Sequence, residues 1–184
     1  MHRIGVIVGS LRKDSINLKL ARVLAKLDKD KFDFNIIKLD DVPMYNEDLW
    51  ENPPEAVLRL KKEVEFSDAI LFVTPEYNRS FSPVVKNAID WGTRPYGQNS
   101  WAGKPASVIG ASPGAVGTSH AQSQLRSIVP ILDMALMGQP EVYLSFKPEF
   151  YDENDNVTDQ STKEFLEKYL SKFDAWIKQV SRNK

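Results

Sequence analysis

A short polar turn joins a strand pattern to a helix pattern near the start of the chain, and it limits the possible folds more than any other feature. Residues 4–8 form a nearly continuous apolar run, which indicates a strand buried on both faces of a parallel sheet. Residues 9–17 are mostly polar. The apolar spacing of one helix face then follows at Leu20, Val23, Leu24 and Leu27. The sequence therefore predicts an α/β chain whose first turn opens into a helix.

This turn carries the groups of an anion-binding site. The first turn of a helix leaves backbone N–H groups without partners and holds partial positive charge. Side-chain donors are available at Ser10, Arg12, Ser15 and Asn17. The helix dipole contributes only about 0.3–1 kcal/mol, whereas each hydrogen bond to a charged group contributes roughly 1.5–3 kcal/mol. Several converging donors therefore favour a phosphate. The alternative is an ordinary turn capped by Ser15, with Arg12 in solvent.

The absence of two motifs limits the kinds of phosphate compound that this turn can bind. The turn has no Gly-x-Gly-x-x-Gly for a dinucleotide pyrophosphate and no Gly-Lys-Ser/Thr for a nucleoside triphosphate. It therefore suits the single terminal phosphate of a monoester.

The composition excludes several functions. The 24 basic and 25 acidic residues leave a formal net charge of -1, which indicates neither a nucleic-acid surface nor a polybasic membrane patch. No cysteine is present, so disulfides, thiolate catalysis and cysteine–metal sites are excluded, and we expect no metal site. The first apolar run is too short to span a bilayer and lacks a signal-peptide cleavage region. We expect one cytoplasmic domain over residues 1–184, without nucleic-acid or membrane partners.

Strand and helix patterns alternate along the rest of the chain. Further strands are expected at residues 32–39, 69–73, 105–110 and 141–144. Helices are expected at residues 55–66, 81–91, from about 119, and along a final apolar stripe over 165–180. Pro130 should end or kink the fourth helix near Val129. In the loop 40–54, we expect the apolar side chains to hold the loop to the body rather than to meet a ligand; these are Met44, Tyr45, Leu49 and Trp50.

Five strands alternating with five helices predict a doubly wound parallel sheet. We expect a flavodoxin-like three-layer α/β/α sandwich with a five-stranded sheet in the order 2-1-3-4-5, whose ligand crevice is bounded by the loops after strands one, three and four. The loop at 75–80 offers the flat face of Tyr77 and the amide of Asn78. Two glycines let the backbone of the loop at 112–117 lie against a planar ring, and its amides would stabilise negative charge there. Plain turns are the alternative for both loops.

Three motifs together carry a family resemblance. They are Gly-Ser-Leu-Arg-Lys-x-Ser-x-Asn at 9–17, Thr-Pro-Glu-Tyr-Asn at 74–78 followed by Lys-Asn-Ala-Ile-Asp-Trp at 86–91, and Gly-x-Ser-x-Gly-x-x-Gly at 110–117. The chain resembles, from residue 4 to about 141, the NAD(P)H-dependent FMN reductase family. This flavodoxin-like group includes bacterial quinone, azo-dye and chromate reductases.

The resemblance implies the cofactor and the residues that hold it. FMN would be the cofactor, with NADPH or NADH as electron donor. Its phosphate would be held in the first loop, where the binding residues are Ser10, Arg12, Ser15, Ile16 and Asn17. Its isoalloxazine ring would be bordered, mainly by backbone groups, by Pro75, Glu76, Tyr77 and Asn78. The pyrimidine end of the ring would lie near Ser112, Pro113, Gly114 and Gly117.

The resemblance also implies a reaction and an assembly. A hydride would pass from the nicotinamide to FMN, and electrons would then pass to quinones, azo compounds, free flavin or similar small-molecule acceptors in ping-pong order. Because the cofactor carries the reactivity, we name no catalytic side chain. Family members are commonly homodimers or homotetramers with the flavin near a subunit interface. We expect Trp91, Arg94, Tyr96 and Trp101 to frame the crevice or, in preference, to form a subunit contact.

The chain departs from the family in two places. Relatives often carry Gly-Gly-x-Arg where this chain has Gly117-Thr118-Ser119-His120, so the cofactor contact of that arginine has no counterpart here. His120 lies in the first turn of a helix, where a cation is disfavoured, and we assign it no catalytic role. Pro130 interrupts a helix that resembles the one through which relatives form dimers.

Two other functions remain as alternatives. The first is a flavodoxin-like electron carrier with a protein partner, but such carriers are typically strongly acidic and the net charge here is only -1. The second is a phosphate-ester hydrolase, but no pair of nucleophile and base is evident around Ser10 or Ser15.

Overall fold

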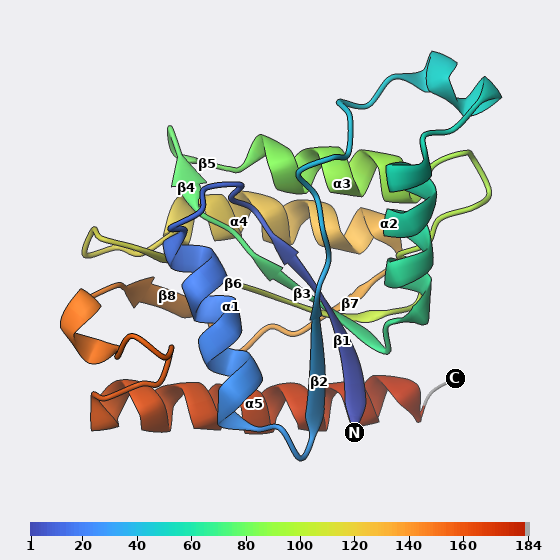
Figure 1. Cartoon of the computed structure of the whole chain (residues 1–184). Helices are drawn as coiled ribbons and strands as arrows, with labels where there is room; N and C mark the ends of the chain where they lie inside the picture. The colour runs from blue at the N-terminus through green and yellow to red at the C-terminus, as the bar shows by residue number, and fades with distance from the viewer. Residues whose placement is uncertain (183–184) are drawn as a thin grey trace.

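A parallel sheet forms the centre of the molecule, as the strand pattern predicts (Figure 1). The computed structural model describes residues 1–182. The first three strands in the chain are β1 (His2–Val8), β2 (Phe32–Ile36) and β3 (Ala69–Val73). The other half contains β6 (Pro105–Ser112), β7 (Ala135–Leu136) and β8 (Val142–Ser145). The spatial order is β2-β1-β3-β6, and both β7 and β8 pair with the far side of β6. This arrangement confirms the predicted order, 2-1-3-4-5.

The fifth strand is divided, which the sequence pattern does not indicate. Only residues 141–144 read as a strand, whereas the structure adds β7 ahead of β8 and separates the two by residues 137–141. Pro140 lies in this separating segment. A proline has no backbone N–H for the sheet ladder, so the pairing with β6 stops and resumes beyond it.

Two layers of helices cover the sheet (Figure 1). On one face, α1 (Ile16–Leu27) and α5 (Gln160–Ser181) pack on Ile4, Val6 and Val8 of β1. On the other, α2 (Glu55–Phe66), α3 (Pro83–Thr93) and α4 (Ser119–Ile128) pack in one cluster with Ile7. Alternate residues of a strand point to opposite faces, so one strand contributes to both cores. No helix among residues 1–182 is long and apolar enough to cross a membrane.

Most predicted element boundaries agree with the structure. The bounds of α2 and β3 are those predicted, whereas β2 ends at Ile36 and not at residue 39. α3 begins at Pro83 because Ser82 caps it by accepting a hydrogen bond from the Val85 N–H. The α-helical part of α4 ends at Ile128 and continues as a 3-10 turn (Val129–Leu132), which confirms the effect predicted for Pro130.

The loop after β2 is held to the body by aromatic side chains. It contains a 3-10 helix (Glu47–Glu51). Tyr45 and Trp50 meet the ring of Trp91 edge-on, with centroids 4.8 and 5.2 Å away, and Leu49 packs on the same core. The prediction is confirmed for these three residues. It is wrong for Met44, which is 73% exposed.

Trp91 and Trp101 are core residues, so the prediction that they frame a crevice or a subunit contact is wrong. Both are fully buried in the core on this face of the sheet, Trp91 as part of α3 and Trp101 in the loop after it. The Trp91 indole donates a hydrogen bond to the Pro43 carbonyl at 2.7 Å. Trp101 fits against Gly92, where any Cβ would lie 2.3 Å from the indole nitrogen. Tyr96, another of the four residues in that prediction, is by contrast 93% exposed in the loop after α3.

Candidate cofactor-binding site

Three loops meet at the carboxyl ends of β1, β3 and β6 and enclose a cleft of about 150 Å³. The cleft is the crevice that the strand order predicts. The lining residues are Ser10, Arg12, Ser15, Ile16, Asn17, Pro75, Glu76, Tyr77, Ala111, Ser112 and Pro113. The structure thus brings together every predicted site residue except Asn78, Gly114 and Gly117, and it adds Ala111.

The start of α1 leaves backbone donors at the cleft. Ser15 is the N-cap, and its Oγ accepts a hydrogen bond from the Leu18 N–H at 3.2 Å. The cap uses an acceptor lone pair, so the hydroxyl hydrogen of Ser15 is still available to donate. Among residues 1–182, the N–H groups of Ile16 and Asn17 have no hydrogen-bond acceptor. The first turn contains no acidic residue to compete with an anion.

Arg12 supplies a positive charge that is not neutralised within the chain. The residue is exposed. Its backbone N–H donates to Ser10 Oγ at 3.4 Å, but its guanidinium makes no hydrogen bond or ion pair with residues 1–182. An unpaired guanidinium beside free helix amides is a donor set suited to a phosphate.

Asn17 joins the first loop to the third. The residue is 3% exposed, and its side-chain amide donates to the Ala111 carbonyl at 3.0 Å and accepts from the Ala111 N–H at 2.9 Å. Its side-chain oxygen therefore has a structural partner, while its backbone N–H remains free for a ligand. Sequence reasoning missed Ala111 because a backbone partner across the sheet has no residue-type signal.

The second loop is a β-hairpin. β4 (Glu76–Tyr77) pairs with the antiparallel β5 (Ser80–Phe81). The two turn residues, Asn78 and Arg79, have φ of 50° and 66°. Asn78 lies in this turn and does not line the cleft. Asparagine tolerates the left-handed conformation, so the turn alone accounts for this residue type here. Tyr77, 43% exposed, donates from its hydroxyl to Ser10 Oγ at 3.4 Å and so connects this hairpin to the first loop.

Glu76 fastens the base of the hairpin to α4. Its Oε2 accepts hydrogen bonds from the His120 and Ala121 N–H groups at 3.1 and 3.2 Å. Its Oε1 lies 3.7 Å from both Arg79 Nη1 and His120 Nδ1. The carboxylate therefore caps a helix whose own N-cap, Thr118, makes no side-chain cap. Only the backbone of Glu76 is free to border a ligand, and His120 lies outside the residues that line the cleft.

The third loop owes its shape to one of its two glycines. Gly117 has a φ of +59°, and a Cβ there would lie 2.6 Å from the Tyr143 carbonyl carbon. Ser112 Oγ donates to the Gly117 carbonyl at 2.6 Å and closes the loop. By contrast, a Cβ on Gly114 would meet only Ser112 Oγ, at 3.6 Å, so the backbone of Gly114 is the part of this loop that is open to a ligand.

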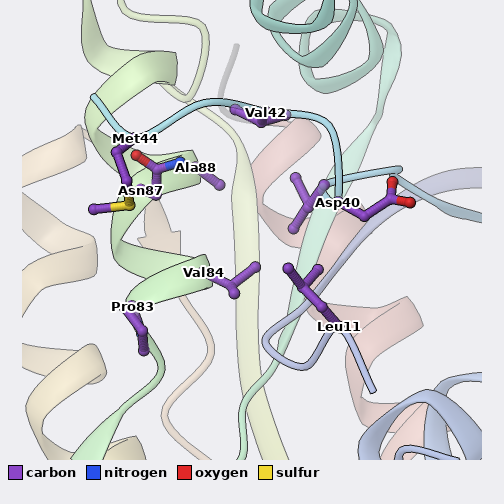
Figure 2. A pocket seen from close by; sticks show the side chains of 9 residues that line it. Leu11, Asp40, Val42, Met44, Pro83, Val84, Asn87 and Ala88 are labelled. Atoms are coloured by element: carbon purple, nitrogen blue, oxygen red, sulfur yellow. The ribbon is translucent and has the colours of Figure 1, made fainter. Parts of the chain in front are cut away.

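A second, apolar pocket of about 130 Å³ lies on the other side of the first loop (Figure 2). Figure 2 shows Leu11 and Val84 approaching it from opposite sides, with the Asp40 carboxylate turned away from them. Asn87 lines it as well, but its amide is bonded to the backbone of Tyr45 and Pro43. The pocket offers no set of donors for a phosphate, so the anion site belongs to the first cleft.

Known proteins resemble this chain over nearly its whole length. The family described as NADPH-dependent FMN reductase matches residues 2–149. A 2-hydroxy-1,4-benzoquinone reductase of Burkholderia sp is 43% identical over 176 residues, which cover 96% of each protein. A quinone reductase of Pseudomonas putida is 44% identical over 179 residues, which cover 97% of this chain and 96% of the relative. The structure of FerB, a flavoenzyme NAD(P)H:(acceptor) oxidoreductase from Paracoccus denitrificans, matches with a TM-score of 0.96 at 48% identity and covers 98% of this chain and 99% of that one.

Proposed function

The chain belongs to the NADPH-dependent FMN reductase family, and from this premise we propose that the cleft between its three loops is where it binds FMN. The resemblance expected from the three motifs is confirmed. The protein is an enzyme of the NAD(P)H-dependent FMN reductase and quinone reductase type, with FMN as its cofactor and NAD(P)H as its electron donor.

One observation carries the proposed position of FMN: the unpaired Arg12 guanidinium lies in the same cleft as the free first-turn amides of α1. FMN ends in a single phosphate, which matches a loop without a pyrophosphate or triphosphate motif. Each hydrogen bond to a charged phosphate oxygen contributes roughly 1.5–3 kcal/mol. The donors would be the Arg12 guanidinium, the Ser10 and Ser15 hydroxyls, and the Ile16 and Asn17 N–H groups.

The other two loops would hold the isoalloxazine ring. Pro75, Glu76 and Tyr77 would border it through their backbones, since the Glu76 carboxylate is already engaged at α4. Ser112, Pro113 and Gly114 would lie near its pyrimidine end, and the open space at Gly114 supports a close approach of backbone and ring. Asn78 and Gly117 would act indirectly, by shaping their loops. Backbone amides near the ring would stabilise the negative charge of the reduced form.

The chemistry comes from the cofactor and the two substrates. When bound in this cleft, FMN would supply the transfer of hydride and electrons between the nicotinamide and a second substrate, and we propose that the two substrates react in turn in this one cleft, in ping-pong order. The names of the relatives support quinones as acceptors. Azo compounds and free flavin are further proposed acceptors. The residues of the chain bind and orient these molecules, and none is assigned as a general acid or base.

We also propose that the protein is a homodimer or homotetramer. A groove beside α3 and the end of α4 is lined by apolar side chains that include Ile89, Ile128 and Ile131. Ile131 is 84% exposed, and a cluster of this kind is typical of an interaction surface. Arg94 lines the same groove, which supports its expected place in a subunit contact.

The proposed reaction is tested with the purified protein under anaerobic conditions. We expect a yellow protein that NADPH bleaches rapidly and that menadione then reoxidises. Slow bleaching that only a protein partner reverses would instead indicate an electron carrier. A colourless protein that does not bind added FMN would contradict the proposal.

A further inference from the structure

A single side chain of α4 holds the tip of the β4–β5 hairpin. Gln124 lies on the exposed side of α4. Its Nε2 donates a hydrogen bond to the Arg79 carbonyl at 2.7 Å. Its Oε1 accepts one from Ser80 Oγ at 2.7 Å. Both ends of the amide are therefore bonded to the hairpin, in addition to the contact of Glu76 at its base.

The turn at this tip needs such support. Asn78 and Arg79 both have positive φ, at 50° and 66°. This pair of left-handed residues is typical of a tight hairpin turn, in which glycine is preferred at the second position. Arginine has a Cβ that disfavours this conformation. The bond from Gln124 falls on the carbonyl of the disfavoured residue itself, so it helps to keep Arg79 in place.

The conformation of the hairpin decides where Tyr77 lies. Tyr77 is two residues before Arg79, lines the cleft and donates to Ser10 Oγ at 3.4 Å. That distance is long for an O–H···O hydrogen bond, so this contact alone holds the Tyr77 side chain only weakly. The two bonds from Gln124 are short, and they connect the hairpin to α4 instead.

We propose that Gln124 is a positioning residue for the flavin: by holding Arg79 and Ser80 it fixes the hairpin conformation that puts Tyr77 beside the cleft. Gln124 does not itself line the cleft. This inference rests on the proposed function, because it assumes that FMN binds between the three loops.

The test is Gln124→Ala in the FMN-loaded enzyme. Loss of two neutral hydrogen bonds should raise the dissociation constant of FMN about tenfold. The fluorescence of bound FMN should change, because Tyr77 shifts within the cleft that holds the flavin, and KM for the nicotinamide should rise more than kcat falls. The melting temperature without FMN should change little, because Gln124 is exposed. Ser123→Ala, an exposed neighbour on α4, is the matched control and should behave as the parent protein does.

Two further variants separate positioning from a general loss of stability. Ser80→Ala should add little to Gln124→Ala, because both remove the same bond. Arg79→Gly should restore FMN affinity in the Gln124→Ala background, because glycine adopts the positive φ without support. Unchanged FMN affinity and fluorescence in Gln124→Ala, or no recovery with Arg79→Gly, would overturn the inference.

A failure of the inference about Gln124 can be distinguished from a failure of the proposed function. If the parent protein binds no FMN, the proposed function fails. The effect of Gln124 on the hairpin is then still tested by hydrogen exchange of residues 76–81 in the protein without FMN. Exchange should be faster in Gln124→Ala than in Ser123→Ala. Equal exchange rates would overturn the inference by themselves.

Discussion

Asn17 shows how a residue of the cofactor loop can serve the fold first. Its side chain pairs with both backbone groups of Ala111 and is almost fully buried. Asn17→Ala would leave two buried backbone groups unpaired, and we expect a loss of about 2–4 kcal/mol in the free energy of unfolding without FMN. Urea denaturation measures this. A variant of normal stability that has lost FMN affinity would instead make the Asn17 side chain a direct phosphate ligand.

Single residues were predictable where their chemistry is local. The polar turn from Ser10 to Asn17 indicates an anion site because its donors are neighbours in the sequence. The burial of Trp91, near the end of α3, and of Trp101, in the loop after it, was not predicted, because the residue type alone does not say which way these side chains face. Gly92, which accommodates Trp101, was not singled out as a sign of close packing.

The loop after β6 contains two glycines with different surroundings. Gly117→Ala would force a Cβ against the Tyr143 backbone at positive φ, and we expect a loss of about 1–3 kcal/mol in stability. Gly114→Ala has room and should fold normally, but it should weaken FMN binding if the backbone lies against the ring. Chemical denaturation and FMN titration of both variants check this. Equal effects on both properties would contradict the division of roles.

α5 offers a test of a helix cap through its pH dependence. Asp159 is the N-cap, and hydrogen bonds from Ser161 and Thr162 hold its pKa below the usual 3.8. A carboxylate whose pKa is lowered by folding contributes stability that is present above its unfolded pKa and is lost as pH falls through its folded pKa. Asp159→Asn keeps an acceptor but does not titrate. The stability advantage of the parent protein over this variant should therefore shrink as pH falls below 3.8. An advantage that is constant with pH would contradict this.

Elements were predictable where periodicity is strong and unbroken. α2 and β3 agree residue for residue. Most of the final apolar stripe lies on the buried face of α5, which includes Leu166, Tyr169 and Phe173, whereas Phe165 at its start is 37% exposed. The β4–β5 hairpin was not predicted, because its strands have two residues each and show no alternation. The two-residue strand β7 was not predicted for the same reason.

A groove with apolar side chains lies beside α3 and the end of α4 on the surface of the protomer. In the proposed assembly, a second subunit would cover this groove. Ile131→Asp places a charge on an 84% exposed side chain, so it should leave the folded protomer intact and dissociate the oligomer. Light scattering coupled to size exclusion measures the mass, with Leu58→Asp, at an exposed site of α2 outside the groove, as the control. An unchanged mass would place the subunit contact elsewhere.

The central claim is that the first loop grips the phosphate of FMN, and an FMN titration of the Arg12→Ala/Ser15→Ala double variant tests it most directly. Circular dichroism confirms that the variant is folded, and Lys13→Ala, an exposed cation in the same loop, is the control. Loss of two charge-assisted contacts predicts an FMN dissociation constant raised by more than about 100-fold. A double variant that still purifies fully loaded, with the affinity of the parent protein, would contradict the account.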